Sequence, residues 1–368
     1  GLGPFPELGV AGAQAILIGL LASLVLGGIG MLTGPAALSL LGASEDVLAI
    51  GSGYARILLG GCGTVMLLFI INAIFRGAGD AAVAMRVLWL ANLINLILDP
   101  CLIFGLGPFP ELGVAGAAVA TTIGRGVGVL YQFWVLARGT SRIRIGLSEI
   151  RLATAVMRTL LRVSLGGIFQ VLVATCSWVA LVRIIALFGS TAVAGYTIAI
   201  RVVIFSILPA WGMANAAATL VGQNLGAGKP DRAERSAWLT GLYNMVFLGC
   251  IAVLFLVFGS SIIGLFSRDP GVLAVGVECL RIISYGYLFY ALGMVVVQAF
   301  NGAGDTTTPS FINFFCYWLF QIPLAYWLAV SSELGPQGVF WAIAIAEAMI
   351  TLVGATLFRL GRWKNRQV

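Results

Sequence analysis

The chain has 368 residues, of which 60% are hydrophobic and only 10% are Asp, Glu, Lys or Arg. A soluble domain usually carries about 25% charged residues, so this composition excludes soluble enzymes and nucleic-acid-binding modules and predicts an integral membrane protein. The net charge of +7 lies mainly between the apolar segments and forms no basic surface for nucleic acid.

Cysteine and histidine usage narrows the chemistry further. The six Cys residues are scattered without a CxxC pair, which is typical of small buried thiols rather than of disulfides or metal sites. The chain has no His, the commonest metal ligand and general base, and no P-loop. We therefore predict no enzyme activity, no cofactor and no partner protein.

Ten apolar segments, taken in chain order, approach or exceed the roughly 20 residues that a helix needs to cross a bilayer. They predict an all-α integral membrane fold. The segments lie near residues 14–41, 50–74, 87–104, 114–137, 163–188, 192–222, 237–265, 274–299, 309–329 and 338–360.

The connections between these segments differ in their content of Lys and Arg. One set, together with the C-terminal tail, holds fifteen Lys and Arg residues, whereas the opposite set holds only Arg268. Positive loops stay in the cytoplasm, so we expect a multi-pass protein of the cytoplasmic (inner) membrane with both termini inside. The start of the chain lacks a charged n-region, so no signal peptide is predicted.

An internal repeat divides the chain into two halves. The sequence FRGAGD at 75–80 recurs as FNGAGD at 300–305, and ELG at 111–113 recurs at 333–335. Both GAGD turns are expected in the cytoplasm, so the halves are parallel repeats, as in one class of transporters. The predicted organisation is an N-lobe of four helices (14–137), a basic linker (138–162) and a C-lobe of six helices with a basic tail (163–368). The first two helices of the C-lobe have no counterpart in the N-lobe.

The first 13 residues are identical to residues 105–117. At 105–117 the segment forms an outer loop that leads into a helix, whereas the expected topology puts residues 1–13 in the cytoplasm. A recent duplication, an assembly error or an engineered junction explains the copy better than a functional element does.

The third segment carries a polar stripe. Asn92, Asn95 and Asp99 are three, four and seven residues apart and therefore share one helical face. A carboxylate with amide oxygens one turn away is a candidate site for Na⁺ or for a titrating proton. In the alternative reading, Asp99 caps the helix end in water and the two Asn side chains bond neighbouring helices. Thr121 and Thr122 on the next segment are placed to face the same pocket.

Other polar residues lie inside the apolar segments. Arg125 and Glu347 occupy equivalent positions of the two halves, and each either contacts the other half or faces a water-filled cavity. Gln170 and Gln298 are either substrate contacts or interhelical hydrogen-bonding groups. Aromatic residues crowd the eighth and ninth segments, where they either line a cavity for flat cations or face lipid.

Three groups of residues together resemble the multidrug and toxic compound extrusion (MATE) family of transporters. They are the stretch Leu220–Lys229 (LVGQNLGAGK), the two GAGD turns, and the NLILDP sequence at 95–100 followed by the Gly-rich stretch 111–122. The resemblance covers about residues 14–360. It implies two six-helix lobes and exchange of organic cations and other amphipathic compounds for Na⁺ or H⁺ by alternating access.

The resemblance also carries the family's cation site onto Asn95 and Asp99, with Thr121 as the best-placed threonine and Asn72 as a candidate substrate contact. The ten segments would be the family's third to twelfth helices, so the Asp that completes this site on the first helix has no counterpart here. Another family branch uses an acidic residue on the seventh helix, which segment 163–188 lacks.

The leading hypothesis is therefore secondary active efflux of small cationic or amphipathic molecules, with Asp99, Asn95, Thr121 and Asn92 as the cation-coupling set and Na⁺ or H⁺ as the coupling ion. Na⁺, if used, would bind at Asp99 and Asn95. The candidate substrate-binding residues are Asn72, Gln170, Gln298, Arg125 and Glu347. The alternatives are a flippase for lipid-linked oligosaccharides, which would need a large basic cavity, and a fragment without transport activity. Membrane lipids are the other expected partners.

Overall fold

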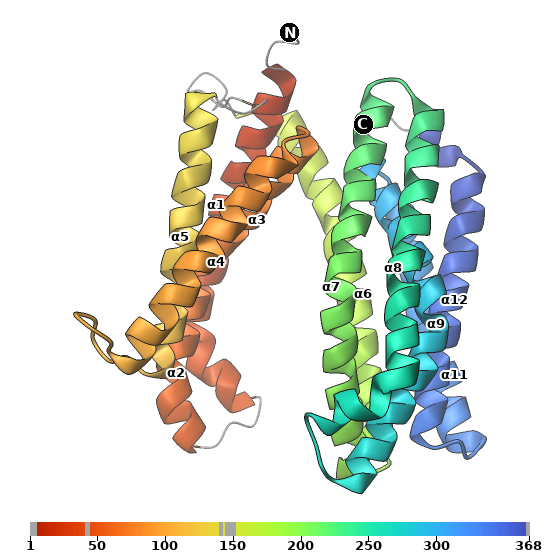
Figure 1. The fold of residues 1–368 in the computed structure, drawn as a ribbon. Coiled ribbons are helices and arrows are strands. Elements are labelled where there is room, and N and C mark those ends of the chain that lie inside the picture. Colours follow the sequence, from red (N-terminus) through yellow and green to blue (C-terminus); the bar gives the residue numbers. More distant parts are fainter. Residues whose placement is uncertain (1–5, 41–44, 140–142, 144–151, 366–368) are drawn as a thin grey trace. The chain divides into compact units, whose positions relative to one another are not determined.

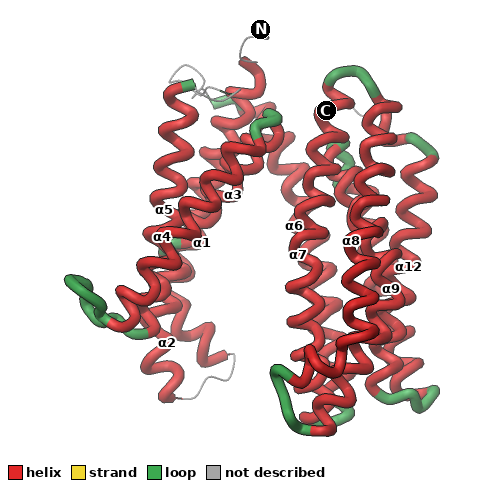
Figure 2. The backbone as a smooth tube through the Cα atoms, viewed as in Figure 1, coloured by secondary structure: helices red, strands yellow, loops and turns green. Residues whose placement is uncertain are grey.

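The computed structural model describes the chain except for residues 1–5, 41–44, 140–142, 144–151 and 366–368 (Figure 1). The chain forms two compact units, residues 1–161 and 162–368. The described residues fold into helices joined by short connections and contain no strand (Figure 2). Ten helical spans are long and apolar enough to cross a membrane, which confirms the predicted fold class.

Unit 1 is built from five helices, which make four of the ten spans. They are α1 (Pro6–Leu40), α2 (Glu45–Gly60), α3 (Cys62–Gly77), α4 (Ala81–Phe104) and α5 (Val114–Arg138). The helix α6 (Thr154–Ala186) starts before the unit boundary, so the last part of the predicted linker 138–162 is helical. Most of the remaining linker lies outside the described residues.

Unit 2 contains the other six spans. After α6 come α7 (Ser190–Gly226), α8 (Pro230–Gly264) and α9 (Pro270–Gly302). The ninth span combines α10 (Thr307–Asn313), the π-helix η2 (Phe314–Gln321), α11 (Ile322–Tyr326) and a second π-helix η3 (Trp327–Ser331). It is followed by α12 (Pro336–Arg359) and the short 3₁₀-helix η4 (Arg362–Asn365).

One predicted span is interrupted. The sequence predicts a single helix over 50–74, whereas α2 ends at Gly60 and α3 begins at Cys62. Two successive glycines have low helix propensity and favour a break at this point. A Cβ atom on Gly61 would lie 2.8 Å from the Thr122 side chain, so the break also lets α5 approach closely.

The two GAGD turns have the same backbone conformation, as the repeat predicts. Gly79 and Gly304 adopt positive φ angles of 83° and 74°, which a residue without a Cβ does readily. In both turns the Asp N–H donates to the Phe carbonyl five residues earlier, at 2.8 Å for Asp80 and 2.9 Å for Asp305. Each turn thus ends one helix and starts the next at equivalent places of the two halves.

The duplicated 13-residue sequence adopts two different structures. Residues 6–9 are part of α1, whereas the identical residues 110–113 lie in the connection between α4 and α5. The next four residues, 10–13 and 114–117, are helical in both copies. The origin of the copy stays a prediction.

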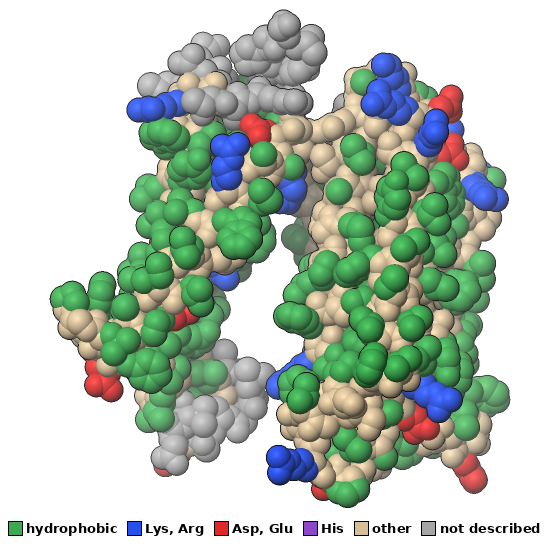
Figure 3. All heavy atoms as spheres, in the orientation of Figure 1, with side chains coloured by type: hydrophobic (Ala, Val, Ile, Leu, Met, Phe, Trp, Pro, Cys, Tyr) green, Lys and Arg blue, Asp and Glu red, His purple; other side chains and the backbone are tan. Residues whose placement is uncertain are grey.

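The sides of each unit are covered mainly by hydrophobic side chains along the helices (Figure 3). Leu24, Trp89 and Leu130 in unit 1 and Phe205, Val257 and Phe311 in unit 2 are each at least 60% exposed. In water these surfaces would be unfavourable, whereas in a bilayer they match the lipid tails.

The C-terminal end of unit 2 is fixed on α8 outside the membrane-spanning segments. The Trp363 ring stacks on Phe358 with centroids 4.5 Å apart, and Lys364 forms ion pairs with Glu234 and Asp231. Hydrogen bonds to Glu234 and Asp231 raise the pKa of Lys364 above its usual value. A lysine with a raised pKa stays charged below pH 10, so Lys364 contributes nothing to a pH dependence of transport near neutrality.

Candidate cation and substrate sites

Unit 2 contains two internal cavities that follow one another along its helices. Their volumes are about 300 Å³ and about 430 Å³. The helices α6, α9 and α12 line both, with residues spaced three or four apart so that one face of each helix points inward. Ala174, Tyr290, Tyr317 and Glu347 line both cavities and form the layer where they meet.

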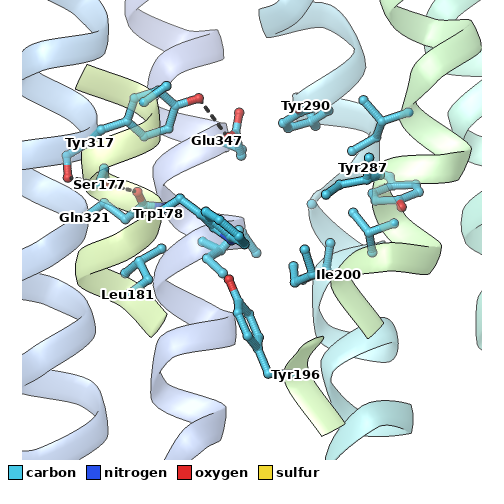
Figure 4. Close-up of a pocket in the computed structure, with 18 residues that line it drawn as sticks. Ser177, Trp178, Leu181, Tyr196, Ile200, Tyr287, Tyr290, Tyr317, Gln321 and Glu347 are labelled. Carbon is cyan, nitrogen blue, oxygen red and sulfur yellow. Dashed lines mark hydrogen bonds between the residues drawn. The ribbon is translucent and has the colours of Figure 1, made fainter. Parts of the chain in front are cut away.

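Glu347 supplies the carboxyl group of this layer. Its side chain comes from the middle of α12, is 8% exposed, and accepts a hydrogen bond from the Tyr317 hydroxyl at 3.1 Å (Figure 4). Within the described part of the chain, the ion pairs are those of Lys364, so Glu347 has no basic partner there. A buried carboxylate without a counter-charge is costly inside a membrane and favours binding of a cation.

The first cavity, which we call the aromatic cavity, is lined by Trp178, Tyr196, Tyr287, Tyr290 and Tyr317 together with aliphatic side chains (Figure 4). The Tyr287 hydroxyl bonds Ser206 at 2.9 Å. The Tyr196 hydroxyl is buried in the same cavity wall. Aromatic rings around one carboxylate suit a flat or bulky organic cation.

The second cavity, which we call the amide cavity, carries a chain of hydrogen-bonded amides. Gln170 donates to the Asn301 side chain and to the Thr306 carbonyl, both at 3.1 Å, and Asn301 donates to Gln298 at 3.1 Å. Asn313 lines the same cavity. Gln170 on α6 thus forms an interhelical hydrogen bond to Asn301 on α9, whereas Gln298 bonds Asn301 of its own helix. Both glutamines line the cavity, and their contact with a substrate stays a prediction.

Unit 1 brings part of the predicted coupling set together. Asn95 on α4 donates from Nδ2 to Asp99 Oδ1 and to Thr121 Oγ1 on α5, in both cases at 3.2 Å. Thr122 instead bonds its own backbone through the Ala118 carbonyl. Asn92 is exposed on the same helix. No group of three His, Cys, Asp or Glu residues occurs in the described ranges, so an ion here would rely on one carboxylate and neutral oxygens.

Two glycines let α5 lie against α4 at this site. A Cβ atom on Gly124 would lie 2.7 Å from the Ala91 carbonyl oxygen, and one on Gly128 would lie 3.3 Å from the Cβ atom of Ala91. The spacing of four residues between these glycines is the small-residue pattern that brings membrane helices close together. The close packing brings Thr121 within hydrogen-bond distance of Asn95.

Two of the predicted substrate-binding residues, Asn72 and Arg125, lie in unit 1 outside this cluster. Asn72 on α3 is fully buried and accepts a hydrogen bond from Gln132 on α5 at 2.9 Å, so it faces a neighbouring helix in this conformation. Arg125 is half-buried on α5, one turn after Thr121. Arg125 belongs to unit 1 and Glu347 to unit 2, and the roles of Asn72 and Arg125 in substrate binding stay predictions.

The position of unit 2 that is equivalent to Asp99 is occupied by an apolar residue. A Cβ on Gly116 would meet Leu102, and a Cβ on the equivalent Gly338 would meet Leu328, in each case at 2.4 Å. These contacts pair Leu102 with Leu328, one position beyond the offset of the GAGD turns, because a π-helix takes extra residues per turn. Leu324 or Ala325 of unit 2 therefore occupies the position equivalent to that of Asp99 in unit 1.

Sequence reasoning missed several lining residues. Ser177 bonds Gln321 at 3.1 Å, and Trp178 and Tyr196 line the aromatic cavity. The spacing of seven residues between Gln170 and Ser177 places them on one helical face and was the available signal. Tyr285, Phe289 and Phe315 face outward. The aromatic residues of the eighth and ninth segments are therefore divided between the lipid-facing surface and the cavity wall.

Comparison with known proteins decides the family. The family model MatE matches residues 1–101 and 167–327. The chain belongs to the MATE family of transporters. This membership confirms the resemblance seen in the sequence and places the chain among multi-pass membrane transporters rather than enzymes.

Individual MATE relatives agree with this assignment. The chain is 31% identical to "Probable multidrug resistance protein NorM" of Thermotoga maritima over 86% of its own length and 68% of that protein. It is 26% identical to "FAD transporter" of Shewanella oneidensis over 95% of its length and 77% of that protein. A MOP superfamily transporter from Pyrococcus furiosus Vc1 has a similar structure, with a TM-score of 0.85 and 25% sequence identity. The match covers 97% of this chain and 83% of that transporter.

Proposed function

We propose that this MATE protein is a secondary active exporter of organic cations and amphipathic drugs. The observation that carries the proposal is Glu347, a buried carboxyl group in the wall of an aromatic cavity that has no basic partner among the described residues. Such a site attracts a lipophilic cation and offers an anionic compound no counter-charge. The relatives named as multidrug resistance proteins support the same substrate class.

The coupling ion, Na⁺ or H⁺, would act in unit 1. Asp99 supplies the negative charge, and the hydrogen bonds of Asn95 hold the carboxylate and the Thr121 hydroxyl in one cluster. Carboxylate, amide and hydroxyl oxygens are hard ligands of the kind that bind Na⁺, and the carboxylate alone is sufficient for a proton. Export requires that the ion and the drug stabilise different conformations.

The membrane and its sidedness follow from charge. The fifteen Lys and Arg residues of one set of connections and the tail support an inner-membrane protein with both termini and the GAGD turns in the cytoplasm. A flippase for lipid-linked oligosaccharides is disfavoured because neither cavity of unit 2 has a Lys or Arg among its described lining residues.

The test of coupling is Asp99→Asn in proteoliposomes. We expect the rate of ethidium export driven by an imposed Na⁺ or H⁺ gradient to fall about 100-fold, because the site loses its charged ligand while keeping its shape. Applying the two gradients separately identifies the ion. The matched control is Glu111→Gln, which changes an exposed carboxylate of the connection after α4 and should transport normally. Gradient-driven export that is unchanged in Asp99→Asn would overturn the coupling site.

A further inference from the structure

The two cavities of unit 2 share one counter-charge. Glu347 lines both, and it is the single charged side chain among the described residues that line either of them. The arginines of the neighbouring helices point elsewhere, because Arg201 and Arg281 are exposed and Arg281 donates to Tyr285. The charge balance of the two cavities therefore depends on this carboxylate.

The cavities differ in the polar groups that they offer. The aromatic cavity has phenol and indole rings and aliphatic side chains, and the carbonyl oxygen of its one amide, Gln321, already accepts a hydrogen bond from Ser177. This lining matches a delocalised or quaternary cation without N–H groups. The amide cavity has Gln170, Gln298, Asn301 and Asn313, whose carbonyl oxygens accept hydrogen bonds. These oxygens match a cation with several N–H donors, such as a guanidinium group.

We propose that the two cavities bind different classes of cation and that Glu347 allows only one of them to be filled at a time. A lipophilic cation without N–H donors binds in the aromatic cavity, and a hydrogen-bonding cation of the guanidinium class binds in the amide cavity. The inference rests on the proposed function, since it assigns two subsites to the same substrate region.

Two cations are prevented from binding at the same time by electrostatic repulsion, and not because their binding sites overlap. The first cation to bind neutralises Glu347, and a second would add an uncompensated positive charge to a buried, low-dielectric site. The Tyr317 hydroxyl and Tyr290 stand in the same layer and supply no further negative charge at neutral pH. Binding of either class should therefore weaken binding of the other, although the ligands contact mostly different residues.

The test is a binding assay on the purified full chain in lipid nanodiscs, with tritiated tetraphenylphosphonium and tritiated benzylguanidinium as probes. In the unaltered protein we expect each cation to displace the other completely. Asn301→Leu should weaken benzylguanidinium binding at least tenfold and leave tetraphenylphosphonium binding unchanged. Ile343→Trp, which enlarges a residue of the aromatic cavity alone, should do the reverse. Each variant thus retains one ligand as proof of folding.

A neutral ligand distinguishes electrostatic competition between the two cations from steric competition for the same space. Triphenylphosphine oxide fills a similar space to tetraphenylphosphonium without a charge, so it should displace tetraphenylphosphonium and leave benzylguanidinium bound. Simultaneous binding of both cations, displacement of both by the neutral compound, or equal losses of both cations in Asn301→Leu would each overturn the two-subsite inference. Those results leave the proposed export of cations standing, whereas failure of both cations to bind at all would contradict the export proposal as well.

Discussion

Replacing Glu347 with Gln is expected to weaken tetraphenylphosphonium binding by a factor of about 100 to 4000. Removing one partner of a buried charge pair costs about 3–5 kcal/mol, and each 1.4 kcal/mol changes an affinity tenfold. The amide keeps the size of the carboxyl group and can still accept the Tyr317 hydrogen bond, so the loss reports the charge. Equilibrium binding in nanodiscs measures the effect directly.

Two variants control this experiment. Glu278→Gln makes the same chemical change on α9 at a residue that lines neither cavity, and it should bind like the unaltered protein. Tyr317→Phe removes the hydrogen bond to Glu347 but keeps the carboxylate, so its effect should stay below about tenfold. An affinity in Glu347→Gln that equals that of Glu278→Gln would rule out Glu347 as the counter-charge of the substrate.

The second large effect concerns the contact of α9 with α7. A Cβ atom on Gly302 would lie 2.2 Å from the Ala218 carbonyl oxygen, and backbone cannot yield there as a flexible side chain would. Overpacking of this kind costs about 3 kcal/mol, so Gly302→Ala should lower the melting temperature in detergent by about 5–10 °C. The substitution should also disturb the amide cavity, since Asn301 is the preceding residue.

Gly212→Ala is the matched control for this prediction. Gly212 lies inside α7, and a Cβ there would meet nothing within 4 Å. Alanine is a better helix former than glycine, so this variant should melt at the same temperature or slightly higher. Equal melting of the two variants would show that the close approach of α7 and α9 is absent from the folded protein.

The fold was predictable because its main determinants are local. The ten apolar segments, the two GAGD turns and the internal repeat could be recognised from hydrophobicity, turn chemistry and recurring motifs alone. The break at Gly61 and the π-helix η2 were not predicted, because each depends on packing against other helices. For example, Gly124 and Gly128 allow α5 to approach α4 closely, but the residue of α4 that they contact cannot be identified from the local sequence.

The candidate sites were predictable to different degrees. Asn95 and Asp99 lie one turn apart on the same helix, so spacing alone placed them together, and the hydrogen bond to Thr121 needed only the next helix. The cavities of unit 2 were harder, because Gln170, Gln298 and Glu347 come from three helices. Composition identified them as polar residues within apolar segments, but tertiary packing alone decides which of them face one cavity.

The most direct test of this account is a crystal structure of the protein with tetraphenylarsonium, whose arsenic atom is located by anomalous scattering. The account predicts one arsenic site in unit 2, within about 6 Å of the rings of Tyr287 or Tyr290 and beside the Glu347 carboxylate. An arsenic atom bound in unit 1 next to Asp99, with none beside Glu347, would contradict the assignment of Glu347 as the counter-charge for transported cations.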